Sequence, residues 1–194
     1  GVYPGFGLDG TPRQPSTCTI EGGSGVSQVH RVEVHKFGGT SVGDAGRIAA
    51  VSRIVRDASA ECRLVVVASA MAGVTDQLVA AGTAAARGDR DEGTRLLDAV
   101  LARHLETANG LELGDAPEIV AEIRRIVEEV SDLIRAVAHL RELTPRTRDD
   151  IIAAGEKLSV RLVTAALNRD GAIARAVDAD TFLERKADWL QRNL

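Results

Sequence analysis

The chain has 194 residues, enough for one domain with a sizeable core, and its apolar fraction of 44% is typical of a globular protein. The formal net charge of −4 argues against a nucleic-acid-binding protein, and no apolar run is long enough to span a membrane. Cys18 and Cys62 suggest no disulfide framework, so we expect free thiols in a reducing compartment and a cytoplasmic protein. The histidines show no spacing typical of metal ligands, so we expect no metal-binding residues.

Residues 1–30 are rich in Gly, Pro, Ser and Thr and show no hydrophobic periodicity. We therefore expect a disordered N-terminal arm, with a linker as the simpler interpretation and a functional arm as the alternative. Residues 31–194 are expected to form the ordered part. The one methionine is Met71, so the chain lacks an initiator, which suggests a fragment or a processed product.

A strand, a helix and a second strand are expected next. Residues 31–37 contain a short apolar-rich run that predicts a strand, and residues 44–58 place Ile48, Val51 and Val55 on one face of a helix. Residues 63–68 contain an unbroken apolar run, which is typical of a strand buried on both faces of a parallel sheet. These three elements predict a right-handed βαβ unit.

The rest of the chain is expected to be mainly helical, which completes an α/β pattern. Helix starts are indicated by Asp89, with Glu92 three residues later, by Asp115 before a proline, and by Thr147, while Pro145 indicates a helix end. The predicted helices cover residues 74–87, 89–107, 115–144 and 147–168, followed by a strand at 172–177 and a loop with the start of a helix at 180–194.

The longest predicted helix carries a heptad stripe of apolar residues. An intramolecular hairpin with the preceding helix is the favoured interpretation because the connection is short, and a coiled coil with a partner is the alternative. The stripe consists of Ile119, Ile123, Ile126, Val130, Leu133, Val137 and Leu140.

The turn between the first strand and the first helix is suited to binding phosphate. Gly38 and Gly39 allow close backbone approach and positive φ, while exposed N–H groups and a helix N-terminus favour negative charge. Lys36 adds a point charge on a flexible stem. Spacing alone does not distinguish this turn from a Gly-Gly connection that binds nothing, and it matches neither a P-loop nor a dinucleotide-binding fingerprint.

Three stretches in order resemble the aspartokinases of the amino-acid kinase superfamily. They begin at Lys36 (KFGGTS), Ser69 (SAMAGVTD) and Gly155 (GEKLS), and the resemblance covers about residues 32–182. It implies an α/β fold with a mostly parallel sheet sandwiched by helices, the amino-acid kinase (carbamate-kinase-like) fold, incomplete at the C-terminus. Residues 31–194 are then the N-terminal portion of a catalytic domain.

The resemblance implies ATP-dependent phosphorylation of the aspartate side-chain carboxylate to 4-phospho-aspartate, the first step of lysine, threonine and methionine biosynthesis. A carboxyl group with an ordinary pKa of about 3.9 is already ionised at neutral pH, so no general base is required. Positioning and positive charge on the transferring group must supply catalysis, a task that Mg²⁺ normally shares. Expected partners are aspartate and ATP, with no nucleic acid and no membrane, and the full-length protein is expected to be a homo-oligomer.

The resemblance also implies roles on the phosphate side of the site. Lys36 is expected to stabilise the transferring phosphoryl group, and the alternative is a solvated lysine at a strand end. The backbone N–H groups of Gly38 and Gly39 are expected to face the phosphates, with the hydroxyls of Thr40 and Ser41 nearby. Two residues of the second stretch complete this side: Ser69 and Gly73.

Thr75 and Glu156 are expected to bind the acceptor substrate. Thr75 lies near a helix start that favours the substrate carboxylate, and a plain helix cap is its alternative interpretation. Glu156 is expected to pair with the substrate α-amino group, and the alternative is an exposed glutamate paired with Lys157 or Arg161. A glycine at 155, inside a helix, costs about 1 kcal/mol relative to alanine and indicates close backbone approach or space for a ligand.

The resemblance is incomplete, and other functions stay open. Residues 185–194 do not resemble the arginine-containing substrate loop of aspartokinases, so the groups that hold the α-carboxylate are unassigned. One alternative is a kinase for another amino acid. Another is a truncated, non-catalytic domain that binds a partner through the heptad stripe or regulates a full-length enzyme.

Overall fold

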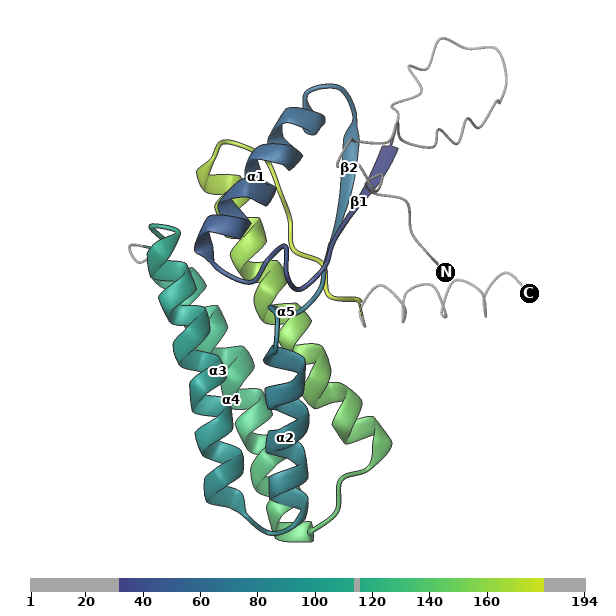
Figure 1. Ribbon diagram of the computed structural model, residues 1–194, viewed down its shortest axis with the longest axis vertical. Helices are drawn as coiled ribbons and strands as arrows, with labels where there is room; N and C mark the ends of the chain where they lie inside the picture. The colour runs from purple at the N-terminus through teal and green to yellow at the C-terminus, as the bar shows by residue number, and fades with distance from the viewer. Residues whose placement is uncertain (1–31, 114–115, 180–194) are drawn as a thin grey trace, which may run out of the picture.

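The structure is a computed structural model that describes residues 32–113 and 116–179 (Figure 1). The predicted N-terminal arm, the cap at Asp115, and the loop and helix start at 180–194 lie outside these residues. The described elements, in chain order, are β1 (Val32–Phe37), α1 (Ala45–Ser59), β2 (Arg63–Ala68), α2 (Val74–Ala86), α3 (Arg90–Gly110), α4 (Pro117–Leu140) and α5 (Pro145–Arg169).

The predicted βαβ unit is confirmed as a parallel pair of strands joined by α1. Val32 lies opposite Arg63, and the register continues without a break to Phe37 opposite Ala68. Helix α1 begins where Asp44 caps it, because the Asp44 carboxylate accepts a hydrogen bond of 2.9 Å from the backbone N–H of Arg47. The parallel register brings the carboxyl ends of β1 and β2 to the same edge of the sheet.

The expectation that β2 is buried on both faces is wrong for the described part of the chain. Leu64, Val66 and Ala68 pack against the core, but Val65 and Val67 stay 48% and 45% exposed. The sheet therefore has one covered face and one open face within the described residues, which is why the burial along β2 alternates.

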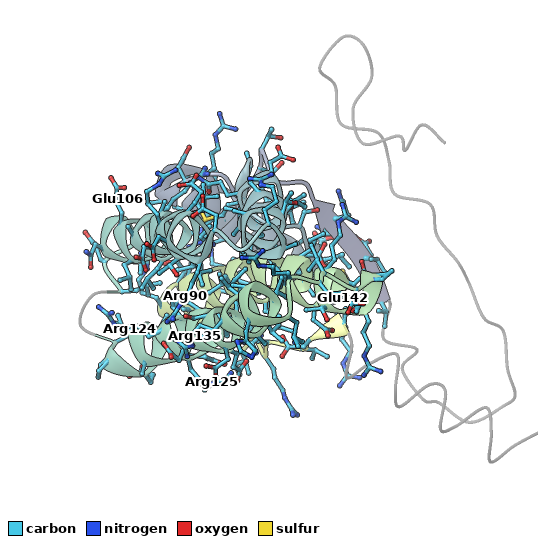
Figure 2. All side chains as sticks on the ribbon, turned by 90° about the horizontal axis from the view of Figure 1, so that it is seen from below. Arg90, Glu106, Arg124, Arg125, Arg135 and Glu142 are labelled. Atoms are coloured by element: carbon cyan, nitrogen blue, oxygen red, sulfur yellow. The ribbon has the colours of Figure 1, made fainter. Side chains whose placement is uncertain are left out.

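Helices α2 to α5 form a bundle at the opposite end of the molecule from the sheet, and α5 runs through both parts (Figure 1). The heptad stripe of α4 faces this bundle: Ile123, Ile126, Val130 and Val137 are buried, and Leu140 at the helix end is exposed. The charged residues Arg124, Arg125 and Arg135 lie on the outer surface (Figure 2). This arrangement confirms the interpretation that the stripe packs within the chain.

Several helix ends differ from the predictions. Thr144, and not Thr147, caps α5: its hydroxyl accepts a 3.1 Å hydrogen bond from the Thr147 backbone N–H. Pro145 therefore starts α5, where its missing N–H costs nothing. The cap at Asp89 is confirmed by a 3.1 Å bond from the Glu92 N–H, but α3 continues past its predicted end to Gly110.

The predicted strand at residues 172–177 is extended but pairs with neither β1 nor β2. The side chain of Asn168 forms hydrogen bonds with both backbone groups of Ala174: it accepts from the N–H at 2.8 Å and donates to the C=O at 3.2 Å. These are groups that a strand ladder would use. A cavity of about 690 Å³ is lined both by β2 and by this segment, so the two run near each other without backbone pairing.

None of the helices in the described ranges combines the length and apolar character that a membrane crossing requires.

His104 of α3 makes the stability of the fold depend on pH. Its side chain is fully buried, Nδ1 lies 2.7 Å from the Val100 carbonyl oxygen, and Nε2 has no hydrogen-bond partner among the described residues. Burial lowers the pKa of this imidazole below its ordinary value of 6.5, against the opposing effect of the Val100 hydrogen bond. The unfolded chain therefore binds a proton more readily than the folded one.

We expect the stability contributed by neutral His104 to be complete above pH 6.5 and to be lost as the pH falls below that value. The slope attributable to this one proton is at most about 1.4 kcal/mol per pH unit. Urea unfolding midpoints between pH 7.5 and 5.5 should therefore fall less steeply in His104→Gln than in the wild type. His139→Gln, at an exposed position of α4, is the control and should keep the wild-type slope. Identical slopes in wild type and His104→Gln would refute this role.

Candidate active site

The loops that follow β1 and β2 touch each other, which brings the first two motifs together. The Ser69 N–H donates to the Phe37 carbonyl at 3.0 Å, and the Ala72 N–H donates to the Gly39 carbonyl at 3.1 Å. A Cβ built on Gly39 would lie only 2.7 Å from the carbonyl oxygen of Ala70. Glycine is therefore required at position 39 by close backbone approach.

Replacement of Gly39 by alanine should destabilise the protein by about 1–3 kcal/mol, the usual cost of forcing extra atoms into a packed site. The obstacle is a backbone oxygen, which cannot rotate away as a side chain can. The matched control is Gly46→Ala in helix α1, where the nearest atom is an Asp44 carboxylate oxygen at 3.4 Å. That change should be neutral or stabilising by up to about 1 kcal/mol. Urea unfolding measures the free energy of unfolding of both variants. Equal values for Gly39→Ala and Gly46→Ala would contradict the close backbone approach at Gly39.

Arg103 of α3 forms hydrogen bonds to both of these loops. Its guanidinium donates to the carbonyl of Ala72 at 2.7 Å and to the carbonyl of Gly43 at 3.0 Å. Gly73, the residue after Ala72, has a φ of +80° and forms the N-cap of α2. Arg103 carries no signal in the sequence, since a lone arginine in a helical pattern is typical of a solvated residue.

Gly155 lets α5 approach the second loop closely. A Cβ on it would lie 3.0 Å from Ala70 Cβ and 3.2 Å from side-chain atoms of Val74 and Leu78. The expected close approach is therefore confirmed, and these side chains, not a ligand, occupy the space beside the glycine. The contact fixes the next residue, Glu156, relative to the loop that begins at Ser69.

A pocket of about 460 Å³ brings together one residue from each of the three motifs: Lys36, Ser69 and Glu156 line it. Its volume lies in the range of small-molecule sites. Lys36 and Glu156 are exposed to the pocket, and Ser69 is half-buried. Lys157 and Asp178 also line it, so the pocket carries two lysines and two carboxylates on a largely apolar wall of β2 and α5.

The other candidate residues do not line the pocket. The Lys36 ammonium lies 3.6 Å from the position of a Cβ on Gly38, so it sits over the glycine turn. Thr40 and Ser41 are exposed, and the Ser41 N–H closes the turn on the Gly38 carbonyl at 2.8 Å. Thr75 is exposed in the first turn of α2, one residue after its start, so the interpretation as a plain helix cap is wrong.

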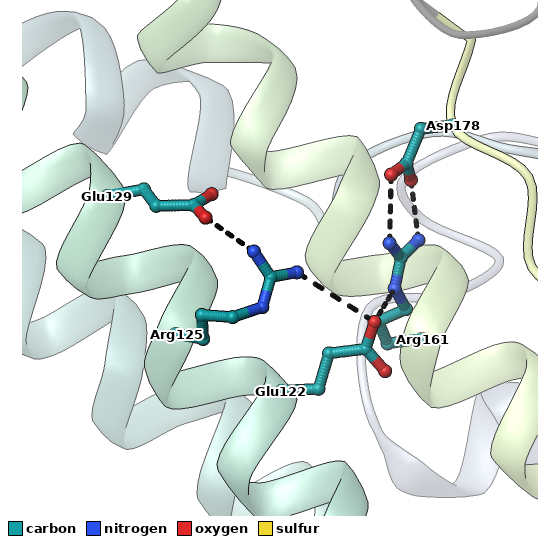
Figure 3. A network of polar contacts seen from close by, with 5 residues as sticks. All are labelled: Glu122, Arg125, Glu129, Arg161 and Asp178. Atoms are coloured by element: carbon teal, nitrogen blue, oxygen red, sulfur yellow. Dashed lines mark hydrogen bonds and ion pairs between the residues drawn. The ribbon is translucent and has the colours of Figure 1, made fainter.

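Arg161 turns away from Glu156. It donates two hydrogen bonds to Asp178 and one to Glu122 (Figure 3), so the alternative interpretation that pairs it with Glu156 is wrong. These hydrogen bonds, above all those to Asp178, raise the pKa of the guanidinium further above its ordinary range. Asp178 itself had no signal in the sequence, because it directly follows the segment expected to be a strand, residues 172–177.

The described residues contain no group of three or more His, Cys, Asp and Glu side chains placed to hold a metal ion. Mg²⁺ is commonly bound by substrate phosphates with one or two carboxylates and several waters, so a Mg²⁺ that arrives with a nucleotide does not require such a group.

Comparison with known proteins identifies the family. Residues 31–192 match the sequence profile of the Amino acid kinase family. The chain belongs to this family. Within it, the chain is 35% identical over 169 residues to aspartokinase 2, chloroplastic, of Arabidopsis thaliana, covering 86% of this chain and 29% of that protein. It is 30% identical to the aspartokinase of Schizosaccharomyces pombe, covering 83% of this chain and 32% of that protein.

Solved structures of this family show the same fold. E. coli aspartokinase III in complex with lysine and aspartate (T-state) superposes with a TM-score of 0.61 at 32% identity, over 73% of this chain and 30% of that chain. The same enzyme in complex with aspartate and ADP (R-state) gives 0.59 at 34% identity, over 72% and 29%. The resemblance to aspartokinases and the amino-acid kinase fold are confirmed. The chain spans about 30% of the length of these relatives.

Proposed function

We propose that the protein of which this chain forms part transfers the γ-phosphoryl group of ATP to the side-chain carboxylate of aspartate. The observation that carries the proposal is the convergence of Lys36, Ser69 and Glu156, one from each motif, on one pocket. The similarity to aspartokinases and the aspartate and ADP named in the complex of aspartokinase III support this choice of substrates. Residues 31–194 are proposed to be the N-terminal portion of the catalytic domain.

In the proposed reaction, an oxygen of the aspartate side-chain carboxylate attacks the γ-phosphorus of ATP. The bond from that phosphorus to the β–γ bridging oxygen breaks, and ADP leaves. The attacking carboxylate is already ionised at neutral pH, so no residue has to remove a proton. What the protein must supply is alignment and positive charge where the phosphoryl group transfers.

On the phosphate side, the Lys36 ammonium is proposed to bind the transferring phosphoryl oxygens from its place over the glycine turn. The N–H groups of Gly38 and Gly39 and the hydroxyls of Thr40 and Ser41 are proposed to contact the phosphates, since they lie beside Lys36 in the same turn. Two residues of the loop after β2 complete this side: Ser69 and Gly73. Mg²⁺, when bound, would neutralise phosphate charge.

On the acceptor side, Glu156 is proposed to bind the substrate α-ammonium group. It lies in the pocket wall opposite the sheet, with Gly155 fixing its distance from the loop after β2. Thr75 is proposed to contact the acceptor as well, near the N-terminus of α2, where a carboxylate is favoured. A cytoplasmic location, a homo-oligomeric full-length protein and roles in lysine and threonine biosynthesis stay predictions.

The proposal is tested by trapping the acyl phosphate with hydroxylamine. The assay contains ATP and Mg²⁺ with aspartate, glutamate or another amino acid, and uses this chain and a version extended by its native downstream sequence. We expect hydroxamate from aspartate in the extended version. Product from a different acid only would replace aspartate as the substrate. If neither folded protein forms a product, a non-catalytic domain is favoured. The heptad stripe of α4 that such a domain was expected to use for a partner is mostly buried within this chain.

A further inference from the structure

Arg161 is the centre of a charge network that joins three parts of the chain. The residue is only 8% exposed, although it carries a full positive charge. Its two Nη groups donate to the two carboxylate oxygens of Asp178 at 2.5 and 2.9 Å, and its Nε donates to Glu122 of α4 at 2.7 Å (Figure 3). A buried guanidinium with this planar, two-pronged pairing defines the position of its partner closely.

The partner, Asp178, belongs to a segment that lacks the usual support of a strand. Residues 172–178 are extended without ladder bonds to β1 or β2. The structure ties the start of this segment by two contacts: the N–H of Ala172 donates to the Leu167 carbonyl at 3.0 Å, and the Asn168 side chain bonds to the backbone of Ala174. At the other end, the pairing with Arg161 holds the residues that reach the pocket.

That end of the segment forms part of the pocket wall. Val177, Asp178 and Ala179 line the pocket together with Lys36 and Glu156. A carboxylate in this wall has two consequences for an anionic acceptor: it repels the carboxylates of the acceptor, and it competes with Glu156 for an ammonium group. Pairing with Arg161 cancels most of the Asp178 charge and leaves Glu156 as the carboxylate available to an ammonium group.

We propose that Arg161 is a positioning residue for the acceptor substrate: through Asp178 it fixes the wall formed by residues 177–179 and neutralises the carboxylate beside Glu156. Arg161 does not line the pocket, so it acts through Asp178 and touches no substrate. This inference rests on the proposed function for its kinetic consequence. The placement of the wall is independent of that function and is measured separately.

The kinetic test uses the full-length protein with aspartate as the varied substrate. Arg161→Gln should raise the KM for aspartate by about tenfold or more, with a smaller change in kcat, because the wall moves and the Asp178 charge is no longer neutralised by Arg161. Arg161→Lys should restore part of the affinity. The double variant Arg161→Gln/Asp178→Asn should have a lower KM than Arg161→Gln alone, because it removes the negative charge that Arg161 neutralises in the wild type. A purely structural role would lower kcat at unchanged KM and would not respond to Asp178→Asn.

Arg125→Gln is the matched control. Arg125 lies in the same network, 4.0 Å from Glu122, but its side chain is 56% exposed and it does not contact Asp178 (Figure 3). Its replacement should change the KM for aspartate by less than about twofold, as expected of an exposed ion pair. Equal effects of Arg125→Gln and Arg161→Gln, or an unchanged KM in Arg161→Gln, would overturn the proposal.

Hydrogen exchange provides a readout that needs no activity. The amides of residues 173–178 should exchange about tenfold faster in Arg161→Gln than in wild type and Arg125→Gln. Should Arg161→Gln fail to fold, Asp178→Asn tests the same contact by the same measurement. Unchanged exchange in the folded variants would refute the proposal that Arg161 fixes the wall formed by residues 177–179. If the wild-type protein forms no aspartyl phosphate, the proposed function fails, while the exchange result still decides whether Arg161 positions the wall.

Discussion

Replacement of Lys36 by alanine should lower kcat for aspartyl phosphate formation by about 10²–10³-fold, the usual effect of removing one group that stabilises charge in the transition state. Lys36 is exposed, lines the pocket and lies over the glycine turn, and its side chain fills no space in the core. Its loss should therefore affect the reaction and leave the fold unchanged. Steady-state kinetics of the full-length variant, with circular dichroism as the check on folding, measure the effect.

Arg53→Ala is the matched control for the loss of one positive charge. Arg53 is exposed on α1 and does not line the pocket. Its removal should leave kcat within about twofold of wild type, since long-range effects of one exposed charge are screened by salt. If Lys36→Ala keeps normal turnover while folded, Lys36 is a solvated strand-end lysine and has no role in phosphoryl transfer.

Replacement of Glu156 by glutamine should raise the KM for aspartate by about ten- to a hundredfold, because a hydrogen bond to a charged group contributes about 1.5–3 kcal/mol. Glutamine keeps the size and the acceptor oxygen but loses the negative charge that attracts the α-ammonium. The KM for ATP should change much less, since Glu156 lies on α5, across the pocket from the glycine turn. Initial-rate measurements with each substrate varied in turn separate the two effects.

Asp149→Asn is the control for Glu156→Gln, because Asp149 is an exposed carboxylate on the same helix and does not line the pocket. It should leave both KM values unchanged. An equal rise in the KM for aspartate and for ATP in Glu156→Gln would contradict a specific contact with the acceptor. An unchanged KM for aspartate would return Glu156 to the status of an exposed surface residue.

Much of this site could be predicted because its residues lie where local sequence decides the structure. The strand before Lys36, the glycine turn and the helix after it follow from short-range rules, and the parallel register then places the ends of β1 and β2 at one edge. Gly155 inside a helical pattern indicated a close contact, which the structure confirms with Ala70. The heptad stripe was also sufficient to predict internal packing of α4.

The parts that could not be predicted depend on long-range side-chain contacts. Residues 172–177 have the composition of a strand, but Asn168 takes the backbone groups of Ala174, and no strand pattern reveals that competition. Arg103 and Arg161 look like ordinary helical arginines, and only the fold shows that one joins two loops and the other holds Asp178. The open face at Val65 and Val67 was missed because an unbroken apolar run carries no information about what covers it.

The most direct test of the proposed phosphoryl transfer is a crystal structure of the full-length protein with aspartate and a non-hydrolysable ATP analogue. The decisive measurements are the distances from the Lys36 ammonium to the γ-phosphate oxygens and from the Glu156 carboxylate to the aspartate ammonium. We expect both distances to lie within about 3.2 Å, the range of hydrogen bonds between charged groups, with the acceptor carboxylate facing the γ-phosphorus between them. A nucleotide bound away from the Lys36 turn, or an aspartate bound outside the pocket that contains Glu156, would contradict the proposed phosphoryl transfer.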